Sequence, residues 1–389
     1  MSPFWSARMQ RLSPYIPGEQ PKGRQFIKLN TNENPYPPSP KVIDAVQRAA
    51  NEKLRLYPDP ECSEFREAVA ARYGVKPGQV FAGNGSDEVL AFGFGAFFES
   101  EAGNADIKSE SVLFPDITYS FYPVYARLWN IPYKTIPLDS EFCIITADYR
   151  QKCGGVIFPN PNAPVGIAVP LNDILSLAKY LLEQGKVLIV DEAYSAFSAN
   201  GNSVNNAASV VPHIGKYPNL LAVHTLSKSA SIAGLRAGFA IGDENLIEGL
   251  RRMRDSFNSY TIDRLALAGA AAAVSDPEYY FSINEKVIAT RRRVTETLIG
   301  FGCTVLPSSA NFIFMKAPGI KGFDFFTALR EEGILVRHFN KDRITDFIRV
   351  SIGTDNEMDV FLDTCGKIIN NKAPGKSSGL NQQPAGNTQ

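Results

Sequence analysis

A lysine in the segment HTLSKSASIAGLRAGFAIG, residues 224–242, has the neighbours that covalent chemistry with an aldehyde requires. The apolar residues just before it predict a buried strand, and the small residues after Lys228 leave its amine open to a ligand. Thr225 and Ser227 add two hydroxyls, and Arg236 adds a guanidinium. A sequestered amine can form a Schiff base with a carbonyl while such groups bind a dianion. The segment therefore predicts a site for a phosphorylated aldehyde.

A carboxylate and a phenol follow a second apolar run, VLIVDEAYSAF at residues 187–197. Asp191 falls at the expected carboxyl end of a parallel strand, where open α/β sheets bind ligands. There it can pair with a protonated pyridine nitrogen, and Tyr194 can reach a phenolic oxygen on the same ring. The expected ligand is pyridoxal phosphate. The alternative is that Asp191 only caps the segment that follows it.

Three further segments offer partners for such a ring. In GNGSDE the order of strand, glycine turn and helix start places Ser86 and Asp87 at the N-cap of a helix, whose free N–H groups can bind phosphate. Asn162 lies in a loop rich in proline and asparagine and can donate to the phenolic oxygen, although a plain turn explains the same residues. Tyr119 follows a short apolar strand and can stack on the ring.

Two arginines stand in apolar strand contexts near the C-terminal end, Arg337 in GILVRHFN and Arg349 in FIRVSIG. A charged side chain in such a place is costly unless an anion pairs with it. Both are therefore candidate anchors for an anionic substrate. An internal salt bridge is the alternative.

The order of these segments resembles that of a known family. YPDP, GNGSDE, TYSFY, PNPNAPVG, DEAY, TLSK, AGLRAGF and IRVSIG are similar to the motifs of the fold-type-I pyridoxal phosphate aminotransferases, and among these to the histidinol-phosphate aminotransferases. The opening run at residues 13–42 resembles the same group, and the likeness covers about residues 12–365. Two positions depart from the pattern: Ala163 replaces the usual asparagine before proline, so that Asn162 is the expected substitute, and His224 replaces a common arginine.

The resemblance implies a role for each matching residue. Lys228, Asp191 and Tyr194 are the implied catalytic residues, which bond the aldehyde, the ring nitrogen and the phenolic oxygen. The other implied cofactor contacts are Gly85, Ser86, Asp87, Tyr119, Asn162, Thr225, Ser227, Arg236 and, from the partner in a homodimer with shared active sites, Tyr57. The implied substrate contacts are Arg337, Arg349, Asn34 and Tyr15.

The resemblance also implies a transaminase of histidine biosynthesis, which interconverts histidinol phosphate and 2-oxoglutarate with imidazole acetol phosphate and glutamate. An aromatic amino-acid aminotransferase and a threonine-phosphate decarboxylase remain alternatives, as does a sensor that binds the cofactor without turnover. The chain shows no helix-turn-helix extension or basic patch that would favour a sensor. The incomplete glycine pattern in GNGSDE argues against a dinucleotide-dependent oxidoreductase.

Composition narrows the class of protein. The 40 basic and 40 acidic residues give zero formal net charge, so there is no electrostatic case for binding nucleic acid or an anionic membrane. The longest apolar run, VLAFGFGAFF, is too short to span a bilayer. An odd, scattered set of 5 cysteines favours reduced thiols and the cytoplasm. With only 3 histidines and no CxxC pair, a metal site is not expected.

The predicted fold is α/β. Alternating strand and helix patterns predict a doubly wound, mostly parallel sheet, and the resemblance implies that it has seven strands and a smaller α+β domain beside it. The expected division is an N-terminal arm that is part of the small domain at 1–45, a large cofactor-binding domain at 46–275, a linking helix and small domain at 276–369, and a disordered tail at 370–389.

Overall fold

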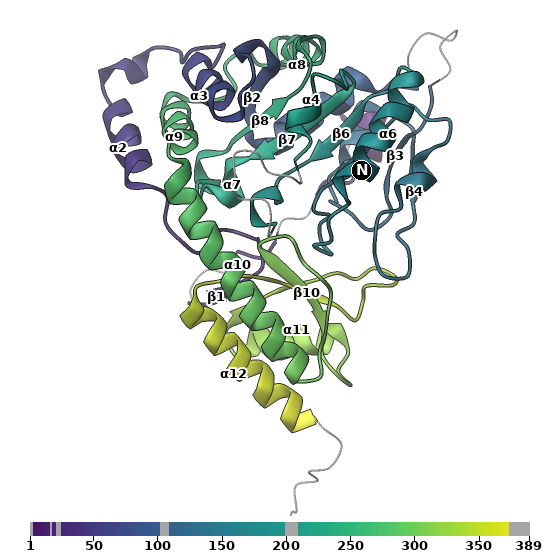
Figure 1. Cartoon of the computed structure of the whole chain (residues 1–389), viewed down its shortest axis with the longest axis vertical. Coiled ribbons are helices and arrows are strands. Elements are labelled where there is room, and N and C mark those ends of the chain that lie inside the picture. The colour runs from purple at the N-terminus through teal and green to yellow at the C-terminus, as the bar shows by residue number, and fades with distance from the viewer. Residues whose placement is uncertain (1–2, 16–17, 21–24, 102–108, 199–208, 373–389) are drawn as a thin grey trace, which may run out of the picture.

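A seven-stranded sheet forms the centre of the larger part of the molecule, at the top of Figure 1. The computed structural model describes residues 3–15, 18–20, 25–101, 109–198 and 209–372. The strand order is β2-β8-β7-β6-β5-β3-β4, and every neighbouring pair is parallel except the two that involve β8. The predicted doubly wound, mostly parallel sheet of seven strands is confirmed. Its strands are β2 (Val80–Asn84), β3 (Val112–Pro115), β4 (Tyr133–Ile136), β5 (Gly155–Pro159), β6 (Leu188–Asp191), β7 (Leu220–Thr225) and β8 (Ala237–Ile241).

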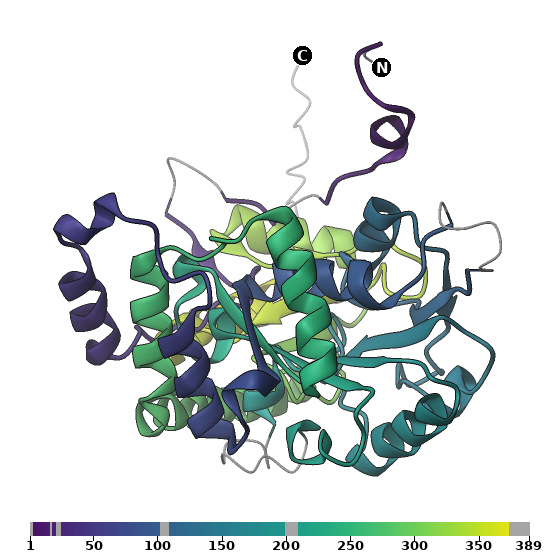
Figure 2. The ribbon, with the colours of Figure 1, turned by 90° about the horizontal axis from the view of Figure 1, so that it is seen from above.

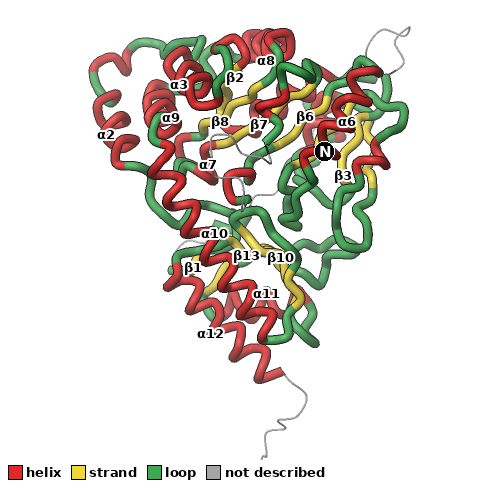
Figure 3. Tube along the Cα trace, viewed as in Figure 1, coloured by secondary structure: helices red, strands yellow, loops and turns green. Residues whose placement is uncertain are grey.

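Helices cover both faces of this sheet, so alternate strand residues enter two separate cores (Figure 3). Leu188 and Val190 of β6 pack in one core, and Ile189 between them packs in the other. Strands buried on both sides need continuous apolar runs, which is why residues 187–190 before Asp191 and residues 220–223 of β7 are all apolar. The covering helices are α3 (Ser63–Tyr73), α6 (Leu171–Glu183) and α9 (Arg264–Val274) on the first face, and α4 (Gly85–Phe97), α5 (Tyr122–Trp129) and α8 (Glu244–Phe257) on the second.

The helix after β2 begins earlier than the sequence predicted. Ser86 and Asp87 were expected at its N-cap, but the cap is Asn84 and both residues lie in the first turn of α4. The chain passes from strand to helix with no linker because Gly85 adopts φ +74°, a conformation that side chains disfavour. The Glu88 carboxylate accepts the Asn84 backbone N–H at 2.7 Å and closes this tight turn.

A smaller antiparallel sheet of four strands, in the order β12-β13-β10-β9, lies at the bottom of Figure 1. Its strands are β9 (Thr304–Val305), β10 (Phe312–Lys316), β12 (Arg337–His338) and β13 (Ile348–Ser351), and it packs with α10 (Pro277–Gly300), α11 (Gly322–Glu331) and α12 (Asp355–Lys372). The long helix α10 runs from the large sheet to this one. The N-terminal arm forms a separate two-stranded sheet, in which β1 (Ile27–Lys28) pairs in parallel with β11 (Ile334–Leu335).

Shorter elements complete the described chain. The first helix, α1 (Ala7–Arg11), is seen near the N-terminus in Figure 2, and its Arg8 donates to the Leu128 carbonyl of α5. The rest are α2 (Pro40–Ala49), η1 (Glu52–Arg55), η2 (Pro77–Gln79), η3 (Thr146–Tyr149), η4 (Ser195–Phe197), η5 (Val211–His213), α7 (Leu226–Ser229) and η6 (Ala233–Leu235). In the part of the chain that the structure describes, no helix has the length and apolar character of a membrane span. Most of the predicted tail, residues 373–389, lies outside the described residues.

Candidate active site

A cavity of about 340 Å³ lies where the carboxyl ends of the central strands face the N-terminal arm and the small sheet. Its walls come from segments more than 300 residues apart in sequence. Sequence reasoning missed the contribution of Thr31 and Glu33 from the arm, because a short polar stretch gives no periodic signal. The predicted residues that line it are Tyr15, Ser86, Asp87, Tyr119, Asp191, Tyr194, Thr225, Ser227, Lys228, Arg236, Arg337 and Arg349.

Lys228 projects from α7, the single helical turn that directly follows β7. The Thr225 hydroxyl caps this turn by accepting the Ser227 backbone N–H at 3.1 Å. Lys228 Nζ donates to the Thr31 carbonyl at 2.8 Å. Burial, and after it the nearby Arg349 charge, lower the pKa of Lys228 to about 8. A substantial fraction of the amine is therefore neutral, and nucleophilic, at mildly alkaline pH.

Asp191 is the last residue of β6, as the sequence predicted. One carboxylate oxygen accepts the Tyr122 hydroxyl at 3.2 Å, and the other accepts the Ala193 backbone N–H at 3.1 Å. Asp191 therefore also caps the segment that follows it, which is the alternative role that the sequence suggests. Burial raises the pKa of Asp191 to about 7, and among the described residues no ion pair to its carboxylate is found. A protonated pyridine nitrogen is a cation that can balance this charge, so the site fits a pyridoxal ring.

The first turn of α4 forms a cradle with Arg236. A Cβ on Gly85 would lie 2.6 Å from Arg236 Nη2, and a Cβ on Gly238 would lie 2.5 Å from the Gly85 carbonyl carbon. Only glycine at both positions allows this close approach. Arg236 also donates to Ser227 Oγ at 3.4 Å and to Asp87 Oδ2 at 2.9 Å. Helix N–H groups, a hydroxyl and a guanidinium at one place suit a phosphate group.

Two tyrosines stand on the cavity wall with their hydroxyls engaged. The Tyr119 hydroxyl donates to Asp87 Oδ1 at 2.6 Å. The Tyr194 hydroxyl accepts from Asn32 Nδ2 at 3.0 Å, and its ring packs edge-on against Phe312 with centroids 5.1 Å apart. These contacts fix both rings at positions where they can touch a planar ligand.

Arg337 and Arg349 lie directly opposite each other on the neighbouring strands β12 and β13. Like charges in that arrangement are destabilising unless an anion separates them. Among the described residues neither arginine forms an ion pair, so the salt bridge weighed as the alternative is not found there. Arg349 donates to the Asn30 carbonyl at 3.0 Å, and its buried Nε has no partner in the described chain. The pair is therefore suited to bind an anion.

The structure does not bring Asn162 to the cavity. Its amide donates to the Ile117 carbonyl at 3.0 Å and accepts the Thr118 hydroxyl at 3.1 Å. Both contacts tie this loop to the segment that follows β3, and it is Ala163 that reaches the cavity wall. The expected contact of Asn162 with a phenolic oxygen therefore has no support, because its side chain faces that segment and does not line the cavity.

Asn34, predicted as a substrate contact, lies behind the lysine. Its amide donates to the Lys228 carbonyl at 3.1 Å and to Asn284 Oδ1 at 3.2 Å, so it positions the lysine backbone. Tyr15 does line the cavity, and its ring lies 4.2 Å from that of Phe121.

Tyr57 lies away from this cavity and is 78% exposed. Its ring stacks on Tyr260 with centroids 4.6 Å apart, and its carbonyl accepts Arg264 at 3.1 Å. These contacts hold the residue in place on the surface.

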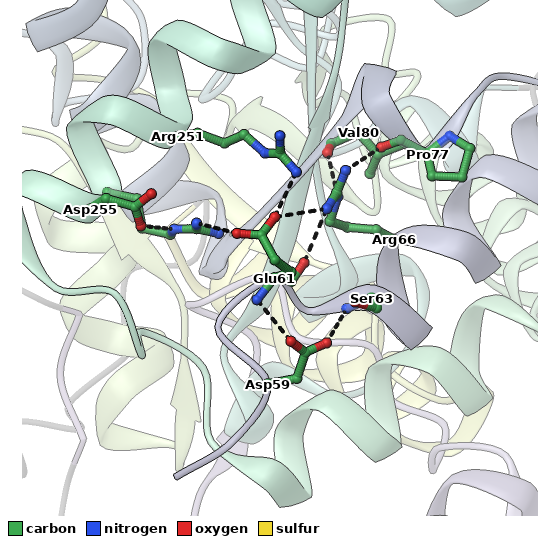
Figure 4. A network of polar contacts seen from close by, with 9 residues as sticks. Asp59, Glu61, Ser63, Arg66, Pro77, Val80, Arg251 and Asp255 are labelled. Carbon is green, nitrogen blue, oxygen red and sulfur yellow. Dashed lines mark hydrogen bonds and ion pairs between the residues drawn. The ribbon is translucent and has the colours of Figure 1, made fainter.

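A polar network fixes the turn around Asp59 and Glu61, which follows Tyr57 in the chain (Figure 4). The Glu61 carboxylate accepts Arg66 at 3.2 Å, Arg251 at 2.6 Å and Arg254 at 3.1 Å. Asp59 accepts the backbone N–H of Glu61 at 3.0 Å and of Ser63 at 2.7 Å. Because side chains of α3 and α8 meet on one carboxylate, the turn is held firmly against both helices.

Comparison with known proteins agrees with this geometry. The model of the family "Aminotransferase class I and II" matches residues 24–364. A histidinol-phosphate aminotransferase of Clostridium acetobutylicum is 50% identical over 369 residues, which are 95% of this chain and 100% of that protein. Histidinol-phosphate aminotransferase 1 of Hydrogenovibrio crunogenus is 49% identical over 92% of this chain and 95% of its own length.

A solved structure has the same fold. Histidinol-phosphate aminotransferase from Sinorhizobium meliloti, in complex with pyridoxal-5'-phosphate, superposes with a TM-score of 0.82 and 23% identity, over 96% of this chain and 99% of that one. The fold and the cavity define a fold-type-I pyridoxal phosphate-dependent transferase. The chain belongs to the class I and II aminotransferase family and, within it, to the histidinol-phosphate aminotransferases.

The lowered pKa of Lys228 predicts how the protein takes up pyridoxal phosphate. Only the neutral amine attacks the aldehyde, so the rate of covalent incorporation should rise with pH through a midpoint of about 8 and then level off. Stopped-flow absorbance after mixing cofactor-free protein with pyridoxal phosphate measures it. Lys228→Ala is the control and should show no covalent phase. A midpoint near the value of an ordinary lysine would contradict desolvation of the amine.

Proposed function

We propose that this chain transfers the amino group of histidinol phosphate to 2-oxoglutarate, giving imidazole acetol phosphate and glutamate, in histidine biosynthesis. The observation that carries the proposal is a pair of arginines, Arg337 and Arg349, over the cavity that contains Lys228. Identity of about half over almost the whole length of named histidinol-phosphate aminotransferases supports it.

Pyridoxal phosphate is the cofactor, and it supplies an aldehyde that takes the amino group and a ring that accepts an electron pair from the substrate carbon. Asp191 would hold the proton on the ring nitrogen, since its buried carboxylate needs a cation. Tyr119 would lie against the ring, and Tyr194 would donate to the phenolic oxygen. The phosphate would be held by the first turn of α4 (Gly85, Ser86 and Asp87) with Thr225, Ser227 and Arg236.

Lys228 would have two tasks. Its Nζ would bond the cofactor, and the free amine would move a proton to or from the substrate carbon that bears the amino group. A lowered pKa suits both tasks, because the amine must be neutral when it accepts the proton. The Thr31 carbonyl, 2.8 Å from Nζ, gives the released amine a hydrogen-bond partner inside the cavity.

One anion site must serve two substrates. Histidinol phosphate presents a phosphate and no carboxylate, whereas glutamate presents carboxylates. A planar guanidinium forms paired hydrogen bonds with either oxyanion, whereas an ammonium group is only a point charge. Arg337 and Arg349 would therefore bind the anionic group of each substrate in turn.

Replacement of Arg349 by lysine tests the substrate assignment. Arg349→Lys should weaken both half-reactions by about 2 kcal/mol, the scale of a charged hydrogen bond lost in a buried site. Stopped-flow measurement of each half-reaction separately decides it, with the exposed Arg293→Lys as the matched control. If the glutamate step falls while the histidinol phosphate step is unchanged, the arginine serves carboxylates only, and an amino-acid aminotransferase is the better assignment.

We also propose a homodimer in which Tyr57 of each subunit reaches the cofactor phosphate of the other. Tyr57 does not line the cavity of its own chain, yet stacking on Tyr260 and the hydrogen bond of its carbonyl with Arg264 hold it at the surface. Large apolar side chains near it in sequence or space are also exposed, namely Leu54 at 55%, Leu56 at 49% and Phe257 at 73%. An exposed apolar group of this kind fits a second copy of the chain.

The unpaired state of all five cysteines supports a cytoplasmic location.

Mixed dimers test the shared site. When Tyr57→Phe subunits combine with Lys228→Ala subunits, one site of each hybrid carries both changes and the other is intact, so activity should exceed that of either parent. Subunit exchange followed by an activity assay measures it. A mixture of Asp191→Asn with Lys228→Ala is the control, because no intact site can arise. Absence of recovery in the first mixture would rule out the shared site.

A further inference from the structure

We infer that Asn32 and Ser351 form a hydrogen-bonded chain that turns the Tyr194 hydroxyl proton toward the cofactor's phenolic oxygen. Asn32 and Ser351 are positioning residues in this scheme, since they act through Tyr194. The inference rests on the proposed role of Tyr194 and adds the reason that its hydroxyl donates to the cofactor.

The direction of each hydrogen bond follows from counting protons. The Asn32 backbone N–H donates to Ser351 Oγ at 2.8 Å, so that oxygen is an acceptor there. The only proton on Ser351 Oγ is then directed at Asn32 Oδ1, 2.9 Å away. This contact identifies the oxygen side of the Asn32 amide and leaves Nδ2 facing Tyr194 Oη at 3.0 Å. Because an amide nitrogen only donates, Tyr194 must accept, and its own proton points elsewhere.

Burial and backbone geometry hold the chain in place. Asn32 is 1% exposed and Ser351 is 2% exposed, so water does not compete for these contacts. Asn32 has φ 56°, a left-handed conformation that asparagine tolerates better than most residues. Its carbonyl accepts the amide of Asn311, at 2.9 Å, just before β10. The amide therefore has one stable orientation.

The surroundings of Tyr194 direct its hydroxyl proton toward the cavity. The ring packs with Ala163 and Phe312, which offer no acceptor in their side chains. The Asn162 amide donates to the Ile117 carbonyl and its side chain does not line the cavity, so it is not placed to donate to the phenolic oxygen at this edge. Donation from Asn32 also makes the Tyr194 hydroxyl a stronger donor, because linked hydrogen bonds polarise one another.

This arrangement has a spectroscopic consequence. A donor on the phenolic oxygen withdraws negative charge from it, and that charge helps to hold the proton on the neighbouring Lys228 nitrogen. The donor therefore lowers the pH midpoint at which the visible absorption of the cofactor-loaded protein changes. If Asn32 and Ser351 only attach the arm to the small sheet, changing them leaves this midpoint where it is.

The test is a pH titration of the visible absorption band of the pyridoxal phosphate-loaded protein. Tyr194→Phe should raise the pH midpoint. Asn32→Gly keeps the backbone conformation but removes the side-chain amide, and it should raise the midpoint by about 0.5 to 1 pH unit, which is a three- to tenfold change in proton affinity. Asn32→Asp should raise it further, because a carboxylate accepts the Tyr194 proton and turns it away from the cofactor. In a Tyr194→Phe background, Asn32→Gly should have no added effect.

The controls separate this inference from the role of Tyr194 itself. Ser39→Ala removes a buried contact that follows the arm, to the Asp276 carboxylate, lies outside the cavity lining and does not touch Tyr194, and it should leave the midpoint unchanged. A raised midpoint in Tyr194→Phe with a wild-type midpoint in both Asn32→Gly and Ser351→Ala overturns the chain and leaves the role of Tyr194 standing. An unchanged midpoint in Tyr194→Phe overturns both.

Discussion

Desolvation of charged side chains in one cavity is the physical constraint on which the site depends. Burial is the largest cause that raises the pKa of Asp191 to about 7 and lowers that of Lys228 to about 8, and it also lowers the pKa of Arg349. Isolated charges of this kind are costly, and a rigid frame is needed to keep them there. The fully buried strands β6 and β7 provide it, since Asp191 ends the first and Lys228 follows the second by three residues. A ligand with a ring cation and anionic groups relieves the cost at each position.

The N-terminal arm connects these charges to the small sheet. Three of its residues form hydrogen bonds with the site. The Thr31 carbonyl accepts the Lys228 amine, the Asn32 amide donates to the Tyr194 hydroxyl, and the Asn34 amide donates to the Lys228 carbonyl. The arm is held in turn by its pairing with β11 and by Ser351 of β13. Ser351 and Arg349 lie two positions apart on one strand, so they share a face. Strand β13 thus carries both Arg349, the proposed substrate anchor, and Ser351, which supports Tyr194 through Asn32.

Local sequence patterns could predict many of the residues that line this site but not the buried hydrogen bonds that hold them in place. Asp191 and Lys228 were identified because each follows an apolar run, and the end of a buried strand fixes where such a side chain lies. Tyr57 and the seven strands came from the resemblance to the aminotransferases. The contact of Asn32 with Ser351 joins residues 319 positions apart, and no periodic pattern reports such a pair. Asn162 was misplaced for a related reason, because the carbonyl that takes its amide lies 45 residues away.

The most direct test of Lys228 as the residue that bonds the cofactor is borohydride reduction of the pyridoxal phosphate-loaded protein, followed by peptide mapping with mass spectrometry. Reduction makes the bond permanent, so the added mass marks the lysine that formed it. The pyridoxyl group should be found on the peptide that contains Lys228, and Lys228→Ala should carry none. A pyridoxyl group on Lys216, which lies outside the cavity, or no labelled peptide at all, would contradict the assignment.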